Sequence, residues 1–125
     1  MGPAQLRAQT NADSAAVVAT ALDYIEGWYE GDSTRMARAL HPDLVERIVR
    51  NGSLGQMGRD DLVRMTANKG PGADADLSDR VSGPDIFGNA ATVRVDADQW
   101  VDFLQLSQID GHWVIVNVLW EMRSR

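Results

Sequence analysis

The chain has 125 residues and a mass of 13.7 kDa, the size of one domain that buries roughly two-thirds of its unfolded surface. A net charge of −6 and a pI near 4.7 disfavour nucleic acid as a partner, because phosphate binding needs clustered Lys and Arg. No apolar run approaches the ~20 residues that span a bilayer, so we expect no membrane segment. Met1–Asp13 lacks the features of a signal peptide, and the absence of cysteine excludes disulfides and thiolate sites, so we expect a cytoplasmic protein.

The N-terminal part begins with small, polar residues. We predict a disordered tail over residues 1–12 and a single domain over residues 13–125. Asp13 or Ser14 can cap a helix that ends near Glu30, because apolar residues recur at spacings of three and four up to that point.

The next segments alternate between helix and strand. A short helix starts at Asp32-Ser33 and is ended by His41-Pro42, since the residue before a proline is disfavoured in the α region. Residues 44–50 are typical of a strand, and Asn51-Gly52 turns the chain into a weak return strand over residues 54–57. A third helix follows Gly58.

A loop rich in Gly, Pro, Ala and Asp covers residues 68–78. Residues 80–87 favour a strand, but Gly83-Pro84 restricts it to a sheet edge or a bulge. Gly88-Asn89 then predicts a hairpin that leads into a strand over residues 91–95.

The C-terminal third forms two amphipathic strands, residues 99–108 and 113–121, joined by Asp110-Gly111. This dipeptide favours a two-residue type I′ turn, and that turn would pair Asp102 with Leu119. In this register one face carries Trp100, Asp102, Leu104, Leu106, Trp113, Ile115, Asn117, Leu119 and Glu121. The other face carries Val101, Phe103, Gln105, Ser107, Val114, Val116, Val118 and Trp120. The first face combines apolar groups with a few polar ones, as small-molecule pockets do, and the second is typical of a packing surface.

The order of elements predicts an α+β fold, with three helices gathered on one face of a curved antiparallel sheet. With the phrases Trp28-Tyr-Glu-Gly-Asp32, Ala39-Leu-His-Pro-Asp43, Trp100-Val-Asp-Phe-Leu104 and Asp110-Gly-His-Trp-Val-Ile-Val-Asn117, this order resembles the nuclear transport factor 2-like (NTF2-like) superfamily. Within that superfamily the chain is most similar to small bacterial proteins labelled SnoaL-like or "putative lumazine-binding".

The resemblance implies a cone-shaped sheet around a central cavity that three helices close, usually in a dimer. Members of the superfamily include isomerases, hydratases, epoxide hydrolases, polyketide cyclases and many proteins without a known reaction. Its enzymes commonly place an Asp in an apolar cavity. Asp102 matches that position in kind, whereas the Tyr-plus-acid arrangement of ketosteroid isomerases has no recognisable counterpart.

Asp102 is the main candidate for a catalytic residue. Between Trp100 and Leu104 it would be partly desolvated, and desolvation raises a carboxyl pKa toward the range useful for proton transfer. The alternative is a solvated Asp102 near the sheet edge, or one paired with Arg94 or Arg47.

His41 is a second catalytic candidate, because the pKa of histidine lies near physiological pH, although a local role at the helix end is the alternative. Candidate ligand-binding residues share an aromatic, apolar or amide side chain on the first helix or the pocket face. They are Tyr24, Trp28, Trp100, Leu104, Asn117 and Leu119. The sequence shows no motif for a metal or a cofactor, and we expect neither.

Three functions remain open. The first choice is a protein that binds a small apolar or aromatic ligand, and the alternative is a cofactor-independent acid–base enzyme that uses Asp102. The third is an association module without a ligand. The three helices can cover only one side of the sheet, and the second face would then form a larger exposed apolar patch than monomers usually tolerate. We therefore also expect a homodimer. Its predicted interface is Val101, Phe103, Val114, Val116, Val118 and Trp120.

Overall fold

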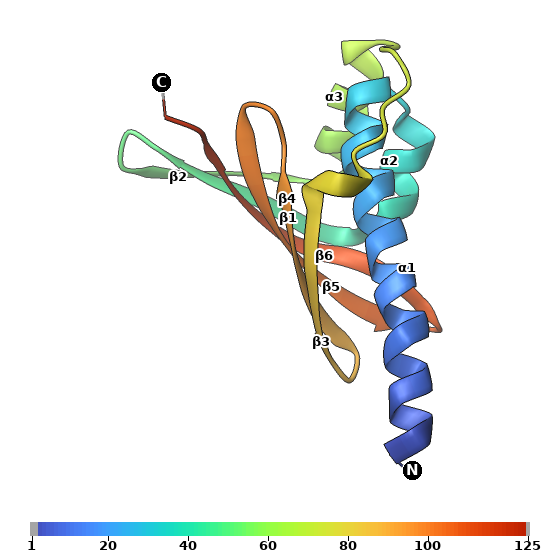
Figure 1. Cartoon of the computed structure of the whole chain (residues 1–125). Helices are drawn as coiled ribbons and strands as arrows, with labels where there is room; N and C mark the ends of the chain where they lie inside the picture. Colours follow the sequence, from blue (N-terminus) through green and yellow to red (C-terminus); the bar gives the residue numbers. More distant parts are fainter. Residues whose placement is uncertain (1–2, 125) are drawn as a thin grey trace.

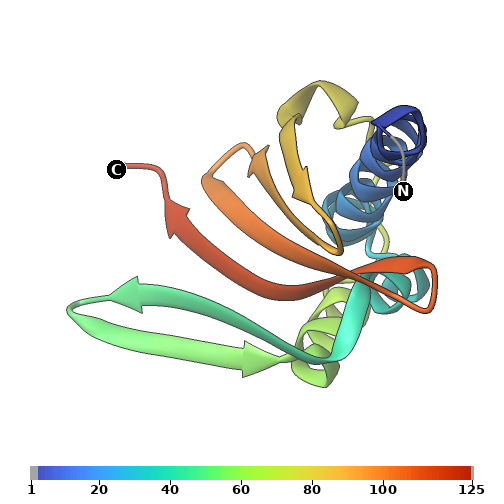
Figure 2. The same cartoon turned by 90° about the horizontal axis from the view of Figure 1, so that it is seen from below.

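A computed structural model describes the backbone of residues 3–124 and the side chains of residues 11–124. The helices are α1 (Pro3–Glu30), α2 (Ser33–Ala39) and α3 (Arg59–Lys69), and a 3₁₀ turn, η1, covers Ser78–Arg80. The strands are β1 (Leu40–Arg50), β2 (Ser53–Gly58), β3 (Val81–Phe87), β4 (Ala90–Asp96), β5 (Trp100–Ile109) and β6 (His112–Met122). Figures 1 and 2 show the helices gathered on one side of a bent sheet, from which the β1–β2 hairpin and the end of β6 extend away.

The first helix is longer than the sequence predicts. It begins at Pro3 rather than at Asp13 or Ser14, so the predicted tail is helical from that point, and its first two residues lie outside the described part. Proline is tolerated in the first turn of a helix, and the residues after it include no helix breaker. Asp13 therefore lies inside the helix and does not cap it, and its carboxylate instead accepts a hydrogen bond from Trp113 Nε1 at 3.1 Å.

The six strands form one open sheet in the order β2-β1-β6-β5-β4-β3. All neighbours are antiparallel except β1 and β6, which run parallel. β3 lies at the edge of the sheet, and its register shifts between Ser82 and Asp85, as Gly83-Pro84 predicts. The predicted α+β fold with helices on one face of a curved sheet is confirmed.

A β-bulge changes the register of the C-terminal ribbon. The Asp110-Gly111 turn pairs Ile109 with His112 as predicted, but the register shifts between Gln105 and Leu106, and Val116 is the extra residue on β6. Asp102 therefore lies opposite Trp120 and not opposite Leu119. Every β6 residue beyond the bulge points to the face opposite to the predicted one, because side chains alternate along a strand.

The core lies between the helices and one side of the sheet, which we call the helix-covered face. Large side chains without solvent exposure meet there, among them Ile25 of α1, Met36 of α2, and Leu104 and Ile115 of the sheet. The opposite side, the open face, carries exposed Phe103. Within the described part of the chain, no helix is long and apolar enough to cross a membrane.

A charged cluster fixes α1 to α2 and to the loop before η1. The Arg35 guanidinium pairs with Asp23 at 3.0 Å, Glu26 at 3.0 Å and Glu30 at 3.1 Å, all from α1. The same Glu26 accepts a hydrogen bond from the Leu77 backbone N–H at 2.9 Å. Glu30 likewise accepts a hydrogen bond from the Ala75 backbone N–H at 3.0 Å. Arg35 therefore neutralises three carboxylates, of which two also hold the loop.

Candidate functional site

A cavity of about 350 Å³ lies between the helices and the sheet. All three helices and strands β1, β2, β5 and β6 contribute to its wall. The lining residues are Tyr24, Ile25, Trp28, Met36, Glu46, Arg50, Met57, Leu62, Met65, Gln99, Trp100, Asp102, Trp120 and Met122. The wall is mainly apolar and aromatic, with two carboxyl groups on the sheet, as is typical of a small-molecule site.

Asp102 is the more deeply buried of the two acids, with only 1% of its surface exposed. The Tyr24 hydroxyl donates to its Oδ1 at 3.2 Å, and Trp100 Nε1 donates to its Oδ2 at 2.8 Å. Burial raises the pKa of Asp102 to about 7, although these two hydrogen bonds act in the opposite direction. The group can therefore exchange a proton near neutral pH.

Glu46 of β1 is the second acid, with 8% of its surface exposed. Its Oε2 has no hydrogen-bond partner among the described residues. Burial, and then the charge of Asp102, raises the pKa of Glu46 to about 7, while the nearby Tyr24 hydroxyl lowers it. Burial and these two carboxylates raise the pKa of Tyr24 well above the ordinary value, so its hydroxyl stays a donor.

Ring contacts hold the aromatic wall in place. Trp100 stacks on Tyr29, with ring centroids 5.9 Å apart and planes at 9°, and meets Trp120 edge-on at 6.4 Å. The Arg50 guanidinium lies 5.2 Å from the centre of the Trp120 ring. Each ring thus has a neighbour over one of its faces, and these contacts fix the orientation of both tryptophans in the cavity wall.

The structure brings together four of the predicted site residues. Tyr24, Trp28, Trp100 and Asp102 all line the cavity, from α1 and β5. Leu104 does not line it, because its side chain has no exposed surface and is part of the core.

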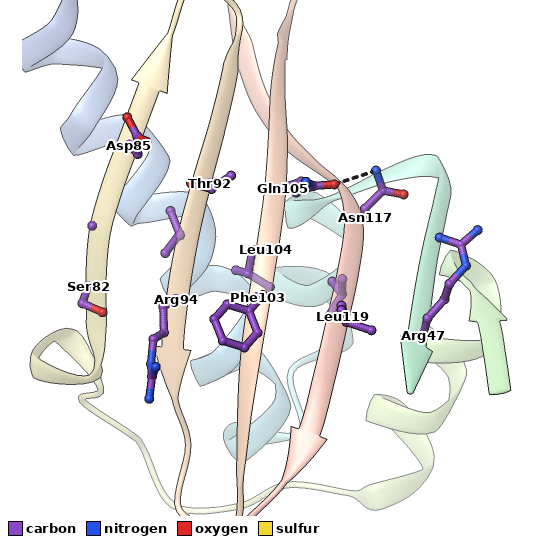
Figure 3. A pocket seen from close by; sticks show the side chains of 13 residues that line it. Arg47, Ser82, Asp85, Thr92, Arg94, Phe103, Leu104, Gln105, Asn117 and Leu119 are labelled. Atoms are coloured by element: carbon purple, nitrogen blue, oxygen red, sulfur yellow. Dashed lines mark hydrogen bonds between the residues drawn. The ribbon is translucent and has the colours of Figure 1, made fainter. Parts of the chain in front are cut away.

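The sequence predicts Asn117 and Leu119 on the face that lines the cavity. This prediction is wrong, because the bulge at Val116 turns both side chains to the open face. Figure 3 shows both on the open face with Phe103 and Gln105, and Asn117 Nδ2 donates to Gln105 Oε1 at 3.2 Å. The same reversal moves two residues of the predicted dimer interface to the helix-covered face. Val118 is 2% exposed there, and Trp120 lines the cavity.

His41 lies in the irregular first part of β1 and does not line the cavity. Its Nδ1 accepts a hydrogen bond from the backbone N–H of Asp43 at 2.9 Å, which is a local role. Among the described residues, no group of three or more His, Cys, Asp or Glu is arranged to hold a metal ion.

Sequence reasoning missed Glu46 and Trp120. Glu46 stands between Leu44 and Ile48 in a strand whose alternate residues are apolar, which is the signal that could have marked it as inward-facing. Trp120 was missed because its face depends on the bulge.

Comparisons with known proteins identify the family and agree with the fold. The family model described as "Putative lumazine-binding" matches residues 12–121. The structure is similar to three crystal structures described as NTF2-like proteins of unknown function. The protein from Shewanella baltica OS155 has 24% identity and a TM-score of 0.78, over 91% of this chain and 96% of that one. The protein from Silicibacter pomeroyi DSS-3 has 24% identity and a TM-score of 0.76, over 91% and 98%.

The third, from Methylobacillus flagellatus KT, has 24% identity and a TM-score of 0.74, over 90% of this chain and 94% of that one. These structural likenesses concern the fold. The comparison with curated proteins found no match.

Proposed function

Because the chain belongs to the "Putative lumazine-binding" family of NTF2-like proteins, we propose that it binds a small, mainly apolar or aromatic molecule in this cavity. The observation that carries the proposal is a space of about 350 Å³ with Trp28, Trp100 and Trp120 in its wall and two buried acids beside them. Tryptophan faces supply stacking area, and a few polar groups in an apolar wall fix orientation.

Lumazine is the first probe, because it is a flat heterocycle and the family name refers to it. We expect it to quench tryptophan emission in a saturable way, since three tryptophans line the cavity. Trp28→Ala should weaken the binding by about tenfold through the loss of one stacking surface. Phe87→Ala removes an aromatic ring that is 91% exposed at the end of β3 and serves as the control, which should bind like wild type. Saturable quenching with equal affinity in Trp28→Ala would show that Trp28 does not stack on the ligand, and an absence of saturable quenching in wild type would contradict binding of lumazine in the cavity.

A second candidate function is cofactor-independent acid–base catalysis by Asp102. It is supported by the pKa of Asp102, raised by burial to about 7, because a catalytic acid or base works best when its pKa is near the working pH. This function shares the cavity with the first and differs in one requirement, since only proton transfer needs an ionisable group at position 102.

We also propose that a second copy of the chain covers the open face. Phe103 is 48% exposed and Leu119 is 52% exposed, and the two pair across β5 and β6 in a groove of about 720 Å³. The charged residues of the groove are Arg47, Asp85 and Arg94, of which Arg94 is already paired with Asp96. Arg47 and Asp85 are of opposite charge, which suits a face that pairs with its own copy about a twofold axis. Of the predicted interface, Val101, Phe103, Val114 and Val116 remain in this proposal.

Leu119→Lys should convert the dimer to a monomer, because it places a charge at the centre of the apolar groove. Sedimentation velocity at micromolar concentration measures the change. Asn68→Lys adds the same charge on the exposed side of α3 and should remain dimeric. A wild-type protein that sediments as a monomer would refute the interface.

A further inference from the structure

The cavity offers hydrogen-bond acceptors that its own donors do not satisfy. The two inner donors, the Tyr24 hydroxyl and Trp100 Nε1, both donate to Asp102. Glu46 Oε2 has no partner among the described residues. A ligand that fills the cavity therefore meets a carboxyl oxygen in need of a donor.

The Glu46 side chain lines the cavity, but only 8% of its surface is exposed to solvent, and Oε2 itself is closed to water in this conformation. The terminal torsion of a glutamate is soft, so a turn of the carboxyl presents Oε2 to a ligand. A buried polar atom costs free energy when it is unpaired, and native proteins nearly always pair such atoms. Glu46 thus has a reason to bind a donor from the ligand.

The charges around Glu46 favour a donor with positive character. Asp102 of β5 lies on the same face of the sheet as Glu46, with β6 between the two strands, and Tyr24 of α1 lies nearby. The carboxylate charge of Asp102 acts on Glu46. The charged group of opposite sign in the wall, Arg50, is exposed and lies over the Trp120 ring. A cationic or strongly polarised N–H between the two acids would relieve their repulsion.

The aromatic wall adds a shape requirement. Trp100 and Trp120 are held by their own ring contacts, so their faces suit a flat ring, and tryptophan faces also attract cations. We propose that the cavity selects a planar heteroaromatic base with an amino group, and that an N–H of this group donates to Glu46 Oε2. This inference rests on the proposed binding function and names the ligand class.

The experiment compares two rings of equal size by calorimetry. The probe 2-aminoquinoline carries the amino donor, and 2-methylquinoline replaces it by a methyl group, without an N–H near pH 8. We expect wild type to bind the amino compound about tenfold more tightly. Glu46→Met keeps the length of the side chain but removes the acceptor, so it should bind both probes equally. Glu121→Gln, at an exposed acid, should keep the wild-type preference.

Each failure has a separate meaning. If neither quinoline saturates wild type but lumazine does, the ligand class is wrong and cavity binding stands. If none of the three saturates wild type, both the ligand class and the binding function are contradicted. If both bind wild type equally, cavity binding stands and the ligand class is wrong. A preference that persists in Glu46→Met overturns the role of Glu46. If this variant does not fold, carboxyl NMR of wild type decides, since binding of 2-aminoquinoline must lower the pKa of Glu46.

Discussion

The protein should be several kcal/mol more stable near pH 5 than near pH 8. Burial raises the pKa of Asp102 and of Glu46 to about 7 in the folded state, whereas both groups titrate near ~4 in the unfolded chain. The folded state therefore holds more protons between these values. This stabilisation is fully present below the unfolded pKa and is lost as pH rises through about 7.

Proton linkage gives the expected difference in unfolding free energy between pH 5 and pH 8. Each carboxyl contributes about 2–3 kcal/mol between pH 5 and pH 8, so the pair contributes on the order of 4 kcal/mol, and the two groups titrate as a coupled pair. Asp23 has a lowered pKa and acts in the opposite sense, but its contribution is lost only on further acidification. Urea unfolding at a series of pH values measures the difference.

Two variants assign the pH dependence to the cavity. Asp102→Asn and Glu46→Gln should each remove about half of the pH dependence, and each should be more stable than wild type near pH 8. Glu121→Gln leaves both buried acids in place and should follow the wild-type curve. A wild-type stability that is constant from pH 5 to pH 8 would show that neither acid is desolvated in the folded protein.

Arg35→Met should cost about 3 kcal/mol of unfolding free energy, because it leaves the partly buried Glu26 and Glu30 without a cation, whereas Asp23 keeps Arg38. The Arg35 side chain is 23% exposed and reaches Asp23, Glu26 and Glu30, and these contacts raise its pKa further. Methionine keeps the apolar stem of arginine, so the loss reports on the guanidinium group. Urea unfolding near neutral pH gives the free energy.

Arg38→Met is the matched control. Arg38 also pairs with Asp23, at 2.9 Å, but its side chain is 62% exposed, and exposed pairs contribute about 1 kcal/mol or less. Faster hydrogen exchange at the Leu77 amide in Arg35→Met alone would show that the loop before η1 depends on the cluster, because Glu26 holds that amide. Equal losses in the two variants would contradict the special role of Arg35.

Turn chemistry made most of the fold predictable. Asn51-Gly52, Gly88-Asn89 and Asp110-Gly111 each mark a hairpin, because these dipeptides accept positive φ, and each lies at a hairpin of the structure. The sequence also predicts the face on which Asp102 lies, because side chains alternate along β5 and the bulge is on β6.

The orientation of the β6 residues beyond the bulge and the position of Glu46 in the cavity were not predictable, because they depend on interactions between strands that local sequence patterns do not encode. The bulge at Val116 has no Gly or Pro to mark it, and β6 pairs there with β1, a strand far away in sequence. The bulge has a large effect, because one extra residue on β6 turns Asn117 and Leu119 to the open face. Val118 and Trp120 then lie on the helix-covered face in their place. Glu46 lines the cavity because β1 pairs with β6, and a pairing between strands so far apart in sequence leaves no local signal.

The parallel pairing of β1 with β6 also has a consequence for the order of assembly. The β1–β2 hairpin and the β3–β6 meander are each built from neighbours in sequence, whereas the β1–β6 pair joins Val45 to Asn117. Closing so long a segment costs chain entropy before the contacts are gained, and such pairings slow folding. Glu46 and Asp102 belong to these separate units. The two acids therefore meet only in the step that joins the halves of the sheet, and their mutual repulsion opposes that step at alkaline pH.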